Sequence, residues 1–113
     1  MHELGLCDML LKKVDSIVKE SDLEGVNSIT VQVGSLSGVV AKYMEDCWSA
    51  VTDGTEYSEC EMKTVVFNGE AECADCGERF VADIENLVCP KCGGKKIFPV
   101  SGTDLVILEI EGY

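Results

Sequence analysis

The sequence lacks the features that mark several common classes of protein. Its longest uninterrupted apolar run is Leu105–Leu108, whereas a membrane-spanning helix needs about 20 apolar residues. The first residues carry acids in place of the basic segment that opens a secretory signal. Only 9 Lys and Arg stand against 21 Asp and Glu, so a net charge of −12 repels nucleic acid and anionic membranes. We expect a soluble, cytoplasmic protein that binds neither.

Histidine is nearly absent as well. The one histidine is His2, so no serine or cysteine nucleophile has an internal imidazole to activate it, and we expect the protein not to be an enzyme. The 113 residues, 46% of them hydrophobic, suffice for one folded domain with a small additional module. The seven cysteines are an odd number and indicate a reducing compartment, not a secreted disulfide framework.

The apolar pattern predicts a small α/β fold. Helical stripes predict a helix over residues 4–21 and a second from Val40 to its end at Gly54, and a serine in the turn at 34–38 is expected to cap the second. Strands are expected over 29–34, 60–66 and 105–110. We therefore predict a three-stranded sheet covered by two helices, whose first two strands are parallel because the second helix connects them.

Several residues outside these strands are expected to fill the core. Cys7, Cys47 and Cys60 lie on apolar faces and are interpreted as small buried hydrophobic residues, not as ligands. Tyr43 and Trp48 are also expected to be buried. The acids and lysines of the first helix are interpreted as a solvated face.

Four cysteines form the strongest motif. Cys73 and Cys76 are separated by twelve residues from Cys89 and Cys92, and each C-x2-C turn directs two sulfurs at one centre, as structural Zn²⁺ requires. Glycines follow each pair and suit such turns. We expect an inserted zinc-ribbon module over residues 70–98 that needs its metal to fold, because so short a segment cannot bury an adequate core.

Two further points concern this module. Four of the nine basic residues fall inside it, and they are expected to offset the negative charge of a zinc tetrathiolate: Arg79, Lys91, Lys95 and Lys96. Four thiolates also accept iron, so a rubredoxin-like iron site is the alternative for the metal.

The amino terminus offers a second, chemically different site. The amine of Met1, the imidazole of His2 and the backbone nitrogens can close adjacent chelate rings on one ion, and nitrogen-rich ligation favours Ni²⁺ or Cu²⁺. The N–H groups at a helix start have no acceptor within the helix. Glu3 could ligate the ion, hydrogen-bond the ring or complement the helix terminus.

In this combination the chain resembles the HypA/HybF family of nickel metallochaperones, which serve the maturation of nickel-iron hydrogenases. The resemblance spans nearly the whole sequence in one order. The matching segments are Met1 to Leu4 followed by LGLCDMLL, Val31 to Gly34, CADCGERF, CPKCGG and Gly102 to Leu105. The MHE start together with the two C-x2-C pairs is far more specific than either feature alone.

The resemblance implies a role for each motif. Nickel would bind at His2 with help from Glu3 and terminal nitrogens, and zinc would bind Cys73, Cys76, Cys89 and Cys92. It further implies that the protein works with a nickel-handling GTPase and with the hydrogenase large subunit, and that some members assist urease. We expect a monomer or homodimer with a nickel-binding α/β domain (residues 1–69 and 99–113) and a zinc-binding domain (70–98).

Two alternative functions assign no role to His2. The first is a zinc-ribbon adaptor that binds proteins and carries no second metal. The second is a rubredoxin-like iron protein that carries electrons.

Overall fold

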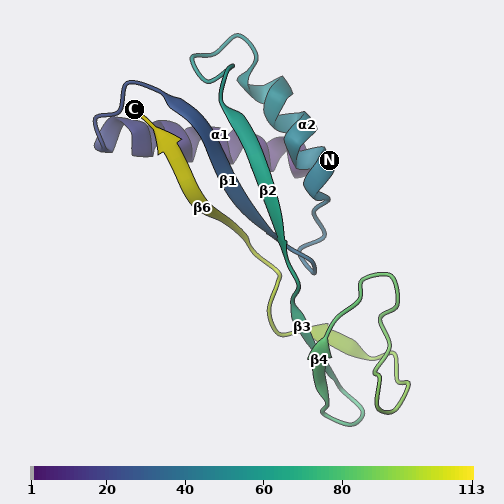
Figure 1. Ribbon diagram of the computed structural model, residues 1–113. Coiled ribbons are helices and arrows are strands. Elements are labelled where there is room, and N and C mark those ends of the chain that lie inside the picture. The colour runs from purple at the N-terminus through teal and green to yellow at the C-terminus, as the bar shows by residue number, and fades with distance from the viewer. Residues whose placement is uncertain (1) are drawn as a thin grey trace. The chain divides into compact units, whose positions relative to one another are not determined.

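The computed structural model describes residues 2–113 of the chain, with side chains from Glu3 onward. Two three-stranded sheets are present, with the strand orders β2-β1-β6 and β4-β3-β5 (Figure 1). In chain order the elements are α1 (His2–Glu20), β1 (Val26–Gly34), α2 (Ala41–Thr52), β2 (Glu61–Phe67), β3 (Glu70–Cys73), β4 (Arg79–Val81), β5 (Ile97–Pro99) and β6 (Leu105–Gly112). The predicted α/β class, with a three-stranded sheet, two helices and an inserted cysteine module, is confirmed.

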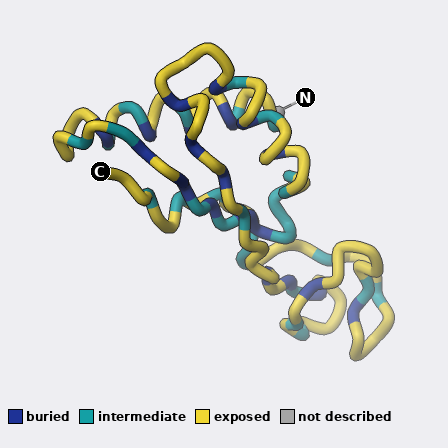
Figure 2. The backbone as a smooth tube through the Cα atoms, turned by 45° about the horizontal axis from the view of Figure 1, so that its top comes forward, coloured by how far each residue is buried: buried dark blue, intermediate teal, exposed yellow. Residues whose placement is uncertain are grey.

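The chain divides into two compact units. The first runs to Gln32 and also contains Val40–Val65 and Val106–Tyr113, and the second contains Val33–Val39 and Val66–Leu105. Each unit has buried residues of its own (dark blue in Figure 2). None of the helices among residues 2–113 is long and apolar enough to cross a membrane.

β1 is the central strand of the first sheet. β2 runs in the same direction as β1, as predicted for two strands connected through a helix, and β6 runs in the opposite direction (Figure 1). Tyr113 N–H donates to the carbonyl of Gly25 at 3.1 Å, where the last strand meets the start of β1. The core combines one face of this sheet with one stripe of each helix: Ile29, Val31, Val33, Met62, Cys7, Val14, Met44 and Trp48.

The two helices pack directly against each other. The Cys7 thiol donates to the carbonyl of Met44 at 3.3 Å, and the Trp48 indole N–H donates to the carbonyl of Cys60 at 2.9 Å. Cys7, Cys60 and Trp48 are buried, as predicted, whereas Cys47 is only half-buried. Tyr43 contradicts the sequence prediction, because 56% of its surface is exposed; its neighbour Met44 occupies the buried stripe instead.

The ends of α2 also test the sequence prediction. Gly54 has φ +77°, the left-handed conformation expected of the glycine that ends a helix. The predicted serine cap is wrong, because the cap residue is Val40 and no side chain caps the helix. The Ser37 hydroxyl closes the preceding turn instead, donating to the Gly34 carbonyl at 2.6 Å and accepting from Val39 N–H at 3.2 Å.

The second unit contains three short strands that the sequence did not predict. In the β4-β3-β5 sheet both neighbours are antiparallel to β3, and Ala71 pairs with Phe80 on one side and with Pro99 on the other. Glycines bring three chain segments into contact beside this sheet. A Cβ placed on Gly34 would lie 2.1 Å from the carbonyl oxygen of Gly102, and one on Gly102 would lie 2.5 Å from the Cα of Gly69.

Replacing Gly34 by alanine should therefore destabilise the protein by about 1–3 kcal/mol, because backbone and not a flexible side chain must move away. Gly5→Ala is the matched control. A Cβ on Gly5 meets nothing within 4 Å, and alanine in a helix is favoured over glycine by roughly 0.5–1 kcal/mol, so this variant should be more stable. Urea unfolding of both variants measures the two changes, and equal effects would contradict the close backbone approach.

Candidate metal centre

The four predicted cysteines meet at one point in the second unit. The sulfurs of Cys73, Cys76, Cys89 and Cys92 all lie within 4.8 Å of one another. The Sγ atoms of Cys73 and Cys92 are 3.6 Å apart and those of Cys76 and Cys89 are 3.5 Å apart. A tetrahedral site with metal–sulfur bonds of about 2.3 Å has sulfur–sulfur edges of about 3.8 Å. The geometry is therefore compatible with one tetrahedral ion and offers it four sulfurs.

The two cysteine pairs adopt the same backbone turn. Gly77 N–H donates to the Cys73 carbonyl and Gly93 N–H donates to the Cys89 carbonyl, each at 2.8 Å. Gly77 and Gly93 have φ of +79° and +74°, which explains why glycine stands at both positions. Gly94 lies close to the cluster itself, since a Cβ there would be 3.2 Å from Cys92 Sγ and 2.8 Å from the movable Asp75 carboxylate.

Backbone amides surround the sulfurs of the second pair. The N–H groups of Lys91 and Cys92 both donate to Cys89 Sγ at 3.4 Å, and Gly94 N–H donates to Cys92 Sγ at 3.4 Å. Burial disfavours the thiolate of Cys89, but hydrogen bonds from the Cys92 and Lys91 amides and from the thiols of Cys76 and Cys92 together lower the pKa of this thiol to about 7. Thiolates are the form that binds metal, so these hydrogen bonds favour the metal-binding form of Cys89.

The amide donors confirm a prediction from the sequence, that the turns at these glycines bring backbone amides toward the sulfurs. Their signal in the sequence was the glycine after each cysteine pair, which permits the turn that directs the amides at sulfur. Among the four basic residues expected to offset the cluster's charge, Arg79 is engaged elsewhere, because its Nε lies 3.3 Å from a Glu72 carboxylate oxygen.

The predicted amino-terminal site is only partly covered by the structure. Met1 and the side chain of His2 lie outside the described residues. Glu3 is half-buried in the first turn of α1. Cys7, one turn further on, is fully buried, and burial first, then Cys47 and Glu3, raise the pKa of its thiol to about 12. These surroundings disfavour the thiolate of Cys7, the form that binds metal, and its burial agrees with the prediction from its apolar position.

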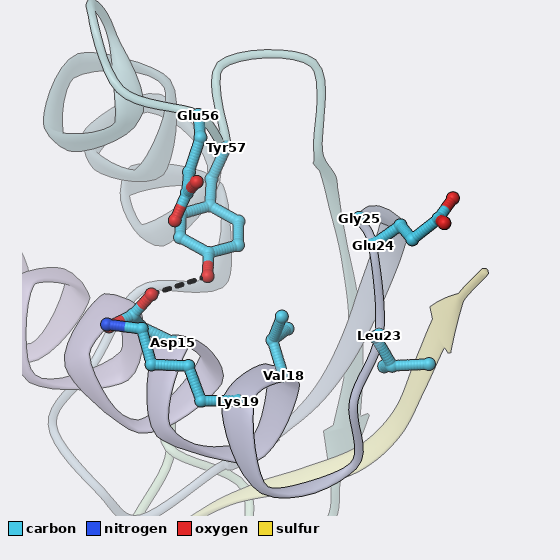
Figure 3. A pocket seen from close by; sticks show the side chains of 8 residues that line it. All are labelled: Asp15, Val18, Lys19, Leu23, Glu24, Gly25, Glu56 and Tyr57. Carbon is cyan, nitrogen blue, oxygen red and sulfur yellow. Dashed lines mark hydrogen bonds and ion pairs between the residues drawn. The ribbon is translucent and has the colours of Figure 1, made fainter.

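A pocket of about 180 Å³ lies in the first unit, between α1 and the segments that follow each helix (Figure 3). Three of its polar side chains bind one another. Asp15 accepts from Lys19 Nζ at 2.8 Å and from the Tyr57 hydroxyl at 2.6 Å. Asp15 was expected on a solvated face, and nothing in its local sequence indicates a partner 42 residues away. Because both interactions occupy the carboxylate, the pocket offers no ligand set comparable to the four sulfurs.

The Asp15 hydrogen bonds predict a measurable titration. The bond from Lys19, followed by that from Tyr57, lowers the pKa of Asp15 below its usual range. A carboxyl group with a lowered folded-state pKa stabilises the protein above its unfolded pKa of about 3.9, and this stability is lost as the pH falls through the folded value. Tyr57→Phe removes one bond, so the Asp15 midpoint should move upward in a carbon-13 NMR titration of the carboxyl group.

Tyr43→Phe provides the control for this titration, because Tyr43 is exposed and belongs to the same residue type. It should leave the Asp15 midpoint unchanged. A Tyr57→Phe protein with an unaltered midpoint would show that Lys19 alone sets the pKa.

Comparisons with known proteins agree with this architecture. Residues 1–112 match the family described as "Hydrogenase/urease nickel incorporation, metallochaperone, hypA". A hydrogenase maturation factor HypA from Prosthecochloris aestuarii is 34% identical over 110 residues, 97% of each chain. One from Beijerinckia indica is 30% identical over 111 residues, 98% of each chain.

A solved structure shares the fold. The solution structure of the nickel metallochaperone HypA from Helicobacter pylori superposes with a TM-score of 0.69 at 20% identity, covering 99% of this chain and 97% of that one. The family match covers almost the whole sequence, from the MHE start through both cysteine pairs to the last strand. The chain therefore belongs to the HypA family of metallochaperones, which incorporate nickel during hydrogenase maturation.

Proposed function

We propose that this chain binds Ni²⁺ at its amino terminus through the amine of Met1, the imidazole and backbone nitrogen of His2, and assistance from Glu3. The observation that carries the proposal is the position of the only imidazole: α1 begins at His2. The N–H groups of a first helical turn have no acceptor within the helix, so nickel ligation by them sacrifices no helical hydrogen bond. Nitrogen-rich ligation also suits Ni²⁺.

The proposed site has to bind nickel reversibly, because the ion is to be passed on to a partner. A dissociation constant near 1 μM corresponds to about −8.2 kcal/mol and still permits rapid exchange. The members of this family act in hydrogenase maturation, which requires protein partners. For this chain the proposed partners are a nickel-handling GTPase and the hydrogenase large subunit, with urease as a further recipient. Transfer of a metal ion from one set of ligands to another needs no catalytic residue, so the proposed role is non-enzymatic.

The proposed second metal is a structural Zn²⁺ held by Cys73, Cys76, Cys89 and Cys92. Four sulfur ligands leave no open coordination position, which suits a permanent ion and not a transferable one. We retain residues 70–98 as the zinc-binding domain, and residues 1–69 with 99–113 as the nickel-binding domain. The sulfurs and nitrogens then separate two metals by ligand type within one short chain.

Nickel titration of the zinc-loaded protein tests the first site. A protein with its native start should bind one Ni²⁺, whereas His2→Ala and a Gly-Ser extension ahead of Met1 should each weaken binding by at least about tenfold, because each removes a nitrogen donor. Calorimetry in two buffers of different ionisation enthalpy should also detect proton release from the ligating amide. Equal binding by all three proteins would refute terminal ligation.

Zinc removal tests the second site. The purified protein should carry one zinc by native mass spectrometry and show no visible absorption, whereas a coloured protein would indicate iron. Cys73→Ser should lose the ion, while Cys47→Ser, a half-buried cysteine outside the cluster, should retain it. Amide hydrogen exchange should accelerate in β3, β4 and β5 on metal removal and stay slow in α1 and β1, because the short module depends on metal for its folding energy. Loss of protection throughout would contradict this division.

A further inference from the structure

The strand β6 forms one edge of the first sheet. The strand order β2-β1-β6 leaves β6 with one neighbour, and Figure 1 shows it at the rim of the sheet. On an edge strand, every second residue points its N–H and C=O groups away from the sheet. β6 extends over eight residues, so it offers a partner strand about four residues that can pair.

Most natural edge strands carry features that prevent pairing with another chain, such as lysine, proline or very short length. The opposite edge, β2, has Lys63 near its middle. β6 reads Leu-Val-Ile-Leu-Glu-Ile-Glu-Gly and contains neither lysine nor proline. Its main chain is therefore available for strand addition, and its only charged residues, Glu109 and Glu111, restrict which strand can add.

The side chains of β6 specify what it would accept. Val106 and Leu108 are 41% and 51% exposed and share one face of the strand. Glu109 and Glu111 are exposed and share the other face. Within residues 2–113, neither glutamate has an ion-pair or side-chain hydrogen-bond partner, unlike Asp8, Asp15 and Glu72, which pair with basic residues.

We propose that β6 is a docking edge for an extended segment of a partner protein that carries two basic residues at alternate positions and apolar residues between them. Main-chain hydrogen bonds to β6 supply binding, as in other cases of strand addition. The alternate basic residues lie opposite Glu109 and Glu111, and the apolar residues cover Val106 and Leu108. Opposite charges on directly facing residues stabilise such a pair.

Electrostatics favours a basic partner over a second copy of this chain. Two copies would each bring a net charge of −12, and antiparallel pairing of two β6 strands would place their glutamates close to one another on a shared ladder. Like charges facing across strands are destabilising. The docking edge does not depend on the nickel proposal, because it uses no terminal residue.

Two blocked peptides test the docking edge on the full-length, zinc-loaded protein. The first is acetyl-Lys-Val-Lys-Val-Thr-Val-Thr-amide, which in antiparallel orientation sets its lysines opposite Glu111 and Glu109. The second replaces both lysines by glutamate. The lysine peptide should slow hydrogen exchange of the outward amides of β6 and bind at least about tenfold more tightly than the glutamate peptide, with a difference that shrinks as salt is added.

A charge exchange makes the assignment specific. The double variant Glu109→Lys and Glu111→Lys should reverse the preference between the two peptides, while Glu61→Lys on the opposite edge strand should leave it unchanged. Nickel binding should be the same in all of these proteins, so failure of docking is distinguishable from failure of the nickel site. Equal binding of both peptides, protection elsewhere, or β6 protection through a dimer that forms without peptide would overturn the proposal.

Discussion

Convergence of four sulfurs on one point is the constraint on which the second unit depends. Few of its residues are buried, and two of those are the cysteines Cys73 and Cys89 themselves. Ordering the residues Val33–Val39 and Val66–Leu105 costs about 1–2 kcal/mol each in conformational entropy, which so small a core offsets poorly. The proposed zinc ion would therefore contribute to the folding of this unit. The local structure also brings the sulfurs together. β3 ends at Cys73, and the positive φ angles of Gly77 and Gly93 allow each turn to bring its second sulfur back toward the first.

The larger elements could be predicted because each repeats one spacing over many residues. α1, α2, β1, β2 and β6 all lie close to their expected positions, although α1 begins two residues earlier and ends one residue earlier than predicted. β3, β4 and β5 could not be found in this way. They are three or four residues long and have burial patterns too short to establish alternation. Tyr43 shows a related limit, because it lies next to the buried stripe of α2 and helical spacing alone does not fix the edge of that stripe.

The cysteine cluster was predictable for a chemical reason. Cysteine pairs with two residues between them have few structural uses other than metal binding. The glycine after each pair indicates the turn that brings the two sulfurs together. Contacts between common residue types carry no such signal. Asp15 fits a solvated helix face equally well with or without the Tyr57 hydroxyl, and the loop containing Tyr57 could be placed only by folding. The same holds for Ser37, whose hydroxyl closes a turn within its own loop instead of capping α2.

A thiolate ligand at the proposed amino-terminal nickel site would hinder release of the ion. A thiolate beside the proposed amino-terminal site would hold the ion more tightly than a chaperone can release it, and Cys7 is only five residues from His2 in the sequence. Cys7 is buried, its thiol donates to the Met44 carbonyl, and burial raises its pKa, so its surroundings disfavour the thiolate. In the proposed function the sulfur ligands are those of the cluster in the second unit, and nitrogen is the donor at the terminus. Under the proposed function, the separation of the buried Cys7 from the four clustered cysteines would suit one ion that stays bound and another that is transferred.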